Sequence, residues 1–208
     1  MGESARNDGA LLPAQLVLAS RSPRRRELLT QCGLRFAVVD VDVEEYPGSA
    51  ESAADYACRV ALDKARAGAR RVGRALPVLG ADTDVVLDGE ILGKPRDREH
   101  ALELLSRLSG RSHQVYSAVA VACSGREAVR LSVTDVCFGP ISPQRAVAYW
   151  DSGEPAGKAG AYAIQGFGAV FVREIRGSYS GVVGLPLFET AELLAECGIE
   201  ILTPPALR

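Results

Sequence analysis

The sequence is poor in features that belong to membrane spans, secretion, disulfide frameworks and zinc sites. Its apolar runs fall short of the ~18 residues that a membrane-spanning helix needs, and residues 1–10 are polar, without the apolar core of a secretion signal. The five cysteines are odd in number and form no CxxC pair, so they predict neither a zinc site nor a disulfide framework. We therefore expect a cytoplasmic protein with reduced thiols and no membrane partner.

Several familiar catalytic motifs are also absent. The chain has no GxxxxGKS or GxxxxGKT loop, and no GxGxxG follows a predicted strand. Its two histidines, His100 and His113, fall on a charged helix and at the start of a strand, so we expect both to be structural and no Ser-His-Asp triad. The formal net charge of −2 argues against binding to a nucleic-acid polymer, which favours strongly basic surfaces.

Lysine is scarce as well. Of the 24 cationic residues only Lys64, Lys94 and Lys158 are lysines, and the rest are arginines. Where arginine is the usual cation, a remaining lysine can mark a site that needs a compact ammonium group, although chance survival is the alternative. Lys94 and Lys158 each follow a glycine, in surroundings typical of phosphate contacts.

With 208 residues, the chain is long enough to bury a large core. Short apolar runs and amphipathic segments predict the order β-α-β-α-β followed by hairpins, which indicates an α/β fold with a central mixed sheet and helices, in two lobes around a cleft. Residues 1–14 are expected to be a flexible arm, and residues 15–208 a single domain. The predicted strands cover residues 15–20, 36–43, 78–81, 85–87, 90–92, 113–123, 127–138 and 168–174, and the predicted helices cover residues 23–32, 52–74, 98–109, 143–150 and 188–197.

The most informative segment is the first strand-to-helix turn. The strand stops at Ser20, and Ser22 and Pro23 form a typical helix start. Four arginines lie in this turn although the helix dipole favours negative charge there, and free N–H groups at a helix N-terminus bind anions. The segment therefore indicates an anionic ligand over the turn, and a solvated basic patch is an equally good interpretation from this segment alone.

Acidic side chains follow two of the predicted strands. Asp42, Glu44 and Glu45 end the strand at residues 36–43, and Asp82 and Asp84 end the strand at residues 78–81. Ligands of open α/β sheets bind beyond the carboxyl ends of the strands, and such carboxylates can share one Mg²⁺. Taken alone they are more often solubilising loop residues. Beside the arginines, Lys64 and Lys94 they indicate phosphoryl-transfer chemistry.

A second unusual segment covers residues 159–168, where small residues allow close approach of a ligand or of another strand. Gln165 lies in this apolar run, and its amide can both donate to and accept from a base edge. Without further information, a glutamine that satisfies a strand edge is the favoured interpretation.

These pieces together resemble the Maf (septum-formation-inhibitor-like) family of nucleoside triphosphate pyrophosphatases, in the inosine-triphosphatase-like superfamily. The resemblance runs in order from about residue 16 to residue 198. It is carried by LASRSPRR at residues 18–25, EE at 44–45, DKA at 63–65, GADT at 80–83, GKP at 93–95, LSG at 108–110, AGAYAIQG at 159–166 and VGLP at 183–186.

The resemblance implies hydrolysis of a nucleotide between its α and β phosphates, a divalent metal cofactor and a homodimer. It implies that Asp82 is the catalytic carboxylate, with Glu45, Lys64 and Lys94 as further catalytic residues. Substrate-binding positions correspond to Ser20, Arg24, Arg25, Thr83 and Gln165, of which Arg24, Thr83 and Gln165 mark the dTTP/UTP branch. CTP and modified pyrimidine nucleotides are further possible substrates, and clearing them from the nucleotide pool is the implied role.

We expect Asp82 and Glu45 to hold Mg²⁺ or Mn²⁺. Asp84 departs from the family pattern, where many members carry an apolar residue, and it either adds charge near the metal or faces solvent. A non-enzymatic, nucleotide-binding regulator of cell division is the alternative function, and the complete set of Asp82, Lys64 and Lys94 favours an enzyme.

Overall fold

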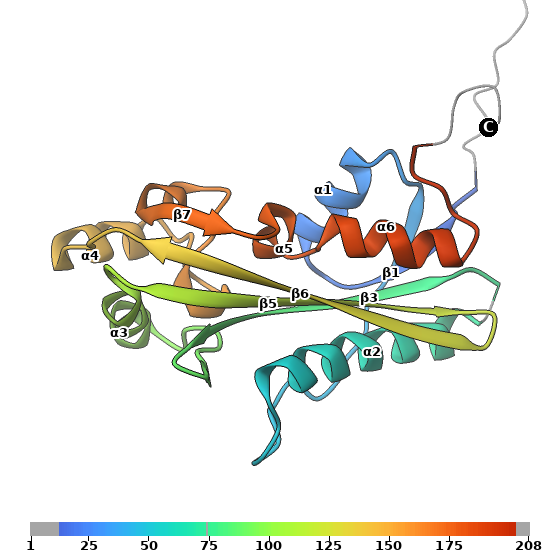
Figure 1. Ribbon diagram of the computed structural model, residues 1–208, viewed down its shortest axis with the longest axis horizontal. Helices are drawn as coiled ribbons and strands as arrows, with labels where there is room; N and C mark the ends of the chain where they lie inside the picture. Colours follow the sequence, from blue (N-terminus) through green and yellow to red (C-terminus); the bar gives the residue numbers. More distant parts are fainter. Residues whose placement is uncertain (1–12, 74, 203–208) are drawn as a thin grey trace, which may run out of the picture.

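The computed structural model describes residues 13–73 and 75–202, and its main feature is one mixed seven-stranded sheet (Figure 1). The strands are β1 (Leu16–Ala19), β2 (Phe36–Val39), β3 (Val78–Leu87), β4 (Glu90–Ile91), β5 (Ser112–Cys123), β6 (Arg126–Phe138) and β7 (Val172–Arg176). They lie in the order β2-β1-β3-β5-β6-β7, and β4 pairs with the end of β3. β1 runs parallel to β2 and β3, and the other pairs are antiparallel. The predicted central mixed sheet is confirmed.

Helices pack on both faces of this sheet. They are α1 (Pro23–Gln31), α2 (Ala53–Val72), α3 (Arg98–Leu108), α4 (Pro143–Asp151), α5 (Tyr179–Val183) and α6 (Leu187–Glu196), with short 3-10 helices η1 (Ala159–Ala161) and η2 (Phe167–Phe171). Several begin where a serine or aspartate side chain accepts a backbone N–H of the first turn, as Ser22 does in α1 and Ser52 in α2. Among the described residues, no helix is both long and apolar enough to cross a membrane.

The two largest apolar clusters of the core lie toward opposite ends of the sheet. One cluster joins β1 and β3 to α1 and α6 through residues such as Leu28, Leu29 and Leu194. The other joins β3, β5 and β6 to α3 and α4, with Leu105 and Tyr149 among its members. In Figure 1, α3 and α4 lie at one end of the sheet and α1 and α6 toward the other. One continuous sheet runs through both clusters, and the expected two lobes around a cleft stay a prediction.

The expected end of the third strand at Ala81 is wrong. β3 continues without a break to Leu87, because Asp82, Thr83 and Asp84 all keep their pairing with β5. The acidic residues therefore lie inside a strand and not in a loop after it. Since successive side chains of a strand point to opposite faces, Asp82 and Asp84 share one face and Thr83 points to the other.

Two other predicted strands also differ from the structure. β2 ends at Val39, where its partner β1 ends, so residues 40–43 have no strand to extend. The strand expected at residues 168–174 begins only at Val172, because Phe167 and Gly168 donate their backbone N–H groups to the carboxylate of Glu154, at 2.8 and 2.9 Å, and this segment forms η2. The expected flexible arm falls mostly on residues outside the described range.

Helix α2 lies unusually close to the sheet. A Cβ atom on Gly80 of β3 would come within 2.3 Å of the Ala61 carbonyl oxygen and 2.5 Å of the Ala65 nitrogen. A Cβ on Gly68 of α2 would meet Val78 of β3 at 2.7 Å. Alanines fill the remaining contact between α2 and β5. Small residues on both sides thus set the height of α2 above β3.

We expect Gly80→Ala to destabilise the fold by about 1–3 kcal/mol, because the new methyl group must push α2 away from the sheet. Denaturant unfolding followed by circular dichroism measures this loss. Gly48→Ala is the matched control, since its Cβ would meet Glu51 at an ordinary 3.5 Å. Equal midpoints for Gly80→Ala and the unsubstituted protein would contradict the account of α2 packing.

Candidate functional site

The candidate site lies at a gap in the sheet beside β3. β1 pairs with Val78 and Leu79 only, and β4 pairs with Val86 and Leu87 only. Between them, residues 80–84 form an open edge of β3, with no strand of the described chain beside them on that side. At Val85 the backbone carbonyl already accepts from the Leu92 N–H at 2.9 Å. Ligands of open α/β sheets bind beyond the carboxyl ends of parallel strands, and β1 ends at this gap.

On the face of β3 covered by α2, one lysine joins two carboxylates. Nζ of Lys64 lies 2.7 Å from Oδ1 of Asp82 and 2.7 Å from Oε1 of Glu45. Nζ of Lys94, just after β4, lies 3.2 Å from the other oxygen of Glu45. Lys64 and Asp82 are buried, whereas the side chain of Lys94 is 62% exposed. The structure thus brings together the four residues predicted as catalytic.

The charge of Glu45 is fixed by these lysines. Partial burial opposes its ionised form, but the hydrogen bonds and the positive charges of Lys64 and Lys94 outweigh burial and lower the pKa of Glu45 to about 2. The carboxylate therefore stays charged across the physiological range. Asp42 and Glu44, which the sequence grouped with Glu45, are exposed and do not join this cluster.

On the opposite face, Arg25 of α1 reaches the same gap. Its Nε donates to the Gly184 carbonyl at 2.8 Å, and its two terminal nitrogens approach Oγ of Ser20 at 3.2 Å and Oγ1 of Thr83 at 3.4 Å. The side chain is buried, and burial lowers its pKa while Asp82 acts in the opposite direction. Arg25, Ser20 and Thr83 therefore form one hydrogen-bonded group next to the carboxylates.

Arg24 lies at the outer side of this group. Its Nε donates to the Val183 carbonyl at 2.9 Å, which ties α1 to α5. Lys158 is close enough that the positive charge of Arg24, after partial burial, contributes to lowering the pKa of its ammonium group. Two cations are therefore held near each other at the N-terminal end of α1, an arrangement that favours an anion between them.

Gln165 stands apart from the other predicted residues. Its side chain is exposed and forms no hydrogen bond within the described chain. The loop that carries it is nevertheless held firmly, because Glu154 accepts from the hydroxyl of Tyr149 at 2.7 Å as well as from the backbone after Gln165. Gln165 therefore does not satisfy a strand edge, and its amide is available to a ligand.

Asp84 does not face solvent, which excludes one of its two expected roles. The residue is 7% exposed, and its Oδ2 atom is buried without a hydrogen-bond partner. Burial and the neighbouring carboxylate of Asp82 raise the pKa of Asp84 to about 8. Its second expected role, added charge near the metal, stays a prediction.

Some residues at the site were not predicted. Ser117 of β5 lies 3.1 Å from the Thr83 hydroxyl, and the Gly184 carbonyl accepts from both Arg25 and Thr83. Tyr56 of α2 is buried close enough to the acidic residues that burial and the charge of Asp84 raise the pKa of its phenol. Tyr56 and Lys64 lie two turns apart in α2 and therefore on the same side of the helix. This helical spacing is the sequence signal that could have identified Tyr56.

Neither histidine joins the site. His100 is near the start of α3, where Asp97 caps its backbone N–H. His113 is buried, with Nε2 2.8 Å from the Tyr162 hydroxyl and its ring edge-on to Phe138. Burial lowers the pKa of His113 to about 4.

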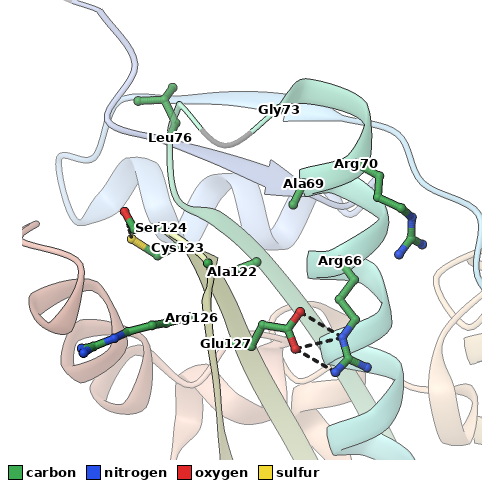
Figure 2. A pocket seen from close by; sticks show the side chains of 11 residues that line it. Arg66, Ala69, Arg70, Gly73, Leu76, Ala122, Cys123, Ser124, Arg126 and Glu127 are labelled. Carbon is green, nitrogen blue, oxygen red and sulfur yellow. Dashed lines mark hydrogen bonds and ion pairs between the residues drawn. The ribbon is translucent and has the colours of Figure 1, made fainter.

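A surface pocket of about 340 Å³ lies elsewhere, at the other end of α2 (Figure 2). It is lined by the C-terminal half of α2 and the β5–β6 hairpin, and Arg66 pairs there with Glu127 at 2.7 Å. None of the predicted site residues lines it. The chemistry-bearing residues therefore gather at the open edge of β3 and not in this hollow.

Comparison with known sequences gives a consistent result. The family model described as Maf-like protein matches residues 15–197. The chain is 57% identical over 184 residues to a dTTP/UTP pyrophosphatase of Saccharophagus degradans, covering 87% of this chain and 88% of that protein. It is 55% identical to a dTTP/UTP pyrophosphatase of Methylococcus capsulatus, covering 89% and 92%, and 54% identical to one of Escherichia coli O157:H7, covering 86% and 91%.

Similarity to solved structures is weaker. A dITP/XTP pyrophosphatase from Mycobacterium abscessus aligns with a TM-score of 0.44 and 22% identity, covering 93% of this chain and 99% of that chain. The Ham1 protein of Staphylococcus aureus aligns with a TM-score of 0.43 and 18% identity, covering 59% and 71%. Both scores lie below 0.5, so the description of the fold rests on its own sheet topology.

The buried His113 predicts a loss of stability in mild acid. Because its pKa in the folded state is lowered to about 4, from 6.5 for a free histidine, unfolding takes up a proton between these values. Stability is then complete above pH 6.5 and falls as pH drops toward 4, by at most about 1.4 kcal/mol per pH unit. Urea unfolding from pH 7.5 to pH 4.5 measures the slope.

His113→Leu removes this contribution, so its slope should be shallower, whereas the half-buried control His100→Gln should keep the slope of the unsubstituted protein. Parallel curves for all three proteins would show that His113 does not titrate in this way.

Proposed function

The chain belongs to the Maf-like protein family, and from this premise we propose that it is a nucleoside triphosphate pyrophosphatase that hydrolyses dTTP and UTP. Water attacks the α-phosphorus, the bond to the α–β bridging oxygen breaks, and the products are the nucleoside monophosphate and pyrophosphate. The relatives named above are called dTTP/UTP pyrophosphatases and match nearly the whole chain.

One observation carries the proposal: Lys64 joins Asp82 and Glu45 at 2.7 Å each, at an open sheet edge that Arg25 reaches from the opposite face. Hydrolysis of a phosphoanhydride needs cations for the departing pyrophosphate and a carboxylate for the attacking water. The gap places both kinds of group next to each other. A cluster of ion pairs that only stabilised the fold would not need Arg25 to reach the same gap from the other face of the sheet.

The side chains have separate tasks in this mechanism. Arg25, Lys94 and the free N–H groups at the start of α1 bind phosphate oxygens. Asp82 orients the attacking water and accepts its proton, and Lys64 holds the Asp82 carboxylate in place through the 2.7 Å contact. As the bridging bond breaks, Arg25 and Lys94 stabilise the negative charge on the leaving pyrophosphate. Ser20 orients Arg25 through its hydroxyl.

The site also fits a divalent cation, Mg²⁺ or Mn²⁺. Asp82 and Glu45 already bind one cationic group together, the Lys64 ammonium, and both offer the oxygen ligands that Mg²⁺ prefers. Among the described residues, no three acidic, histidine or cysteine side chains stand ready as a complete metal site. Mg²⁺ commonly takes one or two carboxylates and completes its shell with substrate phosphates and water. When bound, such an ion neutralises phosphate oxygens and acidifies water.

Selection of the pyrimidine base is assigned to Thr83 and Gln165. Gln165 is exposed on a firmly held loop, and its amide can pair with the O4 and N3–H edge of uracil or thymine. Thr83 lies within the Arg25 group, where its hydroxyl contacts Ser117 and Gly184. Arg24, with Lys158 beside it, holds phosphate charge next to this base. We assign the protein to the cytoplasm and to a homodimer, in keeping with the family resemblance.

Pyrophosphate release tests the reaction. We expect metal-dependent release from dTTP and UTP in the presence of Mg²⁺ or Mn²⁺, and a fall of about 10²–10⁴-fold in turnover for Asp82→Asn, the loss typical of a removed general base. Asp135→Asn is the matched control, because Asp135 is an exposed aspartate in strand β6.

Near-normal turnover by Asp82→Asn would remove Asp82 from the mechanism. A well-folded protein that releases no pyrophosphate from any nucleotide would favour the nucleotide-binding regulator over the enzyme.

Base selectivity is tested by comparing UTP with ATP. We expect a higher kcat/KM for UTP, and Gln165→Ala should lower it by up to about tenfold, which is the value of a lost neutral hydrogen bond. The activity toward ATP should change less. Gln114→Ala, at an exposed glutamine of β5, is the control. Equal rates for UTP and ATP would contradict the assignment of Gln165 and Thr83.

A further inference from the structure

We propose that Asp84 is a direct ligand of the divalent cation, which it shares with Asp82, so that this chain binds the ion before nucleotide arrives. The inference rests on the proposed function and deepens it by adding a residue to its cation site.

The strand places the two carboxylates side by side. Asp82 and Asp84 are separated by one residue in the unbroken strand β3, so both side chains leave the same face and their backbones lie about 7 Å apart. Each pairs in register with β5, opposite Ala118 and Tyr116, which fixes the strand at both positions. Side chains of this length can therefore bring oxygen atoms of both residues to one ion.

Asp84 also has a buried atom that lacks a partner. Its Oδ2 is inaccessible to solvent and accepts no hydrogen bond, although the residue is only 7% exposed. A buried, unpaired carboxylate oxygen is costly, and native proteins almost always satisfy such atoms. A divalent cation beside Asp82 supplies the missing partner, because carboxylate oxygens are its preferred ligands.

The neighbouring cation of the protein does not fill this role. The Lys64 ammonium lies 2.7 Å from Asp82 and 2.7 Å from Glu45, and no hydrogen bond joins it to Asp84. Asp84 is therefore a third carboxylate, in addition to Asp82 and Glu45, which both contact Lys64. Asp82 and Asp84 together offer two carboxylates from one strand, which is the number that Mg²⁺ commonly takes, and the Lys64 ammonium offsets one of these charges.

The test is Mn²⁺ binding to the full chain without nucleotide, measured by electron paramagnetic resonance of free Mn²⁺ and by calorimetry. We expect one site in the unsubstituted protein and an affinity at least about tenfold lower in Asp84→Asn, the loss that a removed supporting group at a metal site typically causes. Asp135→Asn removes the same charge from an exposed position on β6, outside the cluster, and should bind Mn²⁺ as the unsubstituted protein does.

Thermal unfolding gives a second readout. Mn²⁺ should raise the melting temperature of the unsubstituted protein and raise that of Asp84→Asn and Asp84→Val less, because only the folded state offers the site. Without metal, Asp84→Val should melt no lower than the unsubstituted protein, since it removes a buried group without a partner. This comparison separates loss of the site from loss of the fold.

Equal Mn²⁺ affinities for Asp84→Asn and the unsubstituted protein would overturn the inference and leave Asp84 as a neutral, protonated neighbour of Asp82. No binding to the unsubstituted protein at millimolar Mn²⁺ would overturn it as well. Pyrophosphate release, measured in parallel on the unsubstituted protein, reports the proposed function separately. If the protein releases pyrophosphate and its Mn²⁺ affinity does not depend on Asp84, only this inference is rejected. If its Mn²⁺ affinity depends on Asp84 but no pyrophosphate is released, only the proposed function is rejected.

Discussion

The candidate site depends on the ion pair between Lys64 and Asp82. The two groups meet at 2.7 Å in a buried position, and they join the middle of α2 to the middle of β3. Taking either charge out of water is costly, and the pair is stable only while both partners are present. Glu45, which is partly exposed, forms a second ion pair with Lys64. This ion pair holds the segment after β2 next to α2 and β3. The ammonium thus connects three separate parts of the chain.

This ion pair is possible only because α2 lies so close to the sheet. Lysine and aspartate must reach each other across the helix–sheet interface, and Gly80 together with Gly68 permits that short approach. On the other face, Arg25 is aimed by the Gly184 carbonyl and by Ser20, independently of α2. Two sets of side chains, oriented from opposite faces, therefore meet at the one stretch of β3 that lacks a neighbouring strand. A continuous sheet would have kept them apart.

The sequence predicted most of this arrangement because the signals are local. Ser22 and Ser52 are N-cap residues that mark the starts of α1 and α2, and the spacing of apolar residues locates the long strands and helices. The scarcity of lysine drew attention to Lys64, Lys94 and Lys158, and the structure places the first two within salt-bridge distance of Glu45. Charged residues inside β3 were read as the end of a strand, since composition outweighed a pairing that only β5 supplies. The burial of Asp84 likewise depends on packing between distant segments, which no local pattern reports.

The open edge of β3 has a consequence for solubility. Unpaired strand edges are templates on which a second polypeptide can add a strand, and proteins commonly protect them with inward-pointing charges or short, blocked edges. Residues 80–84 have both protections, because β1 and β4 close the two ends of the gap and Asp82 and Asp84 lie within it. A foreign strand entering there would lie directly beside these buried carboxylates. The acidic residues thereby guard against edge-to-edge aggregation, a role they fulfil whether or not a nucleotide is present.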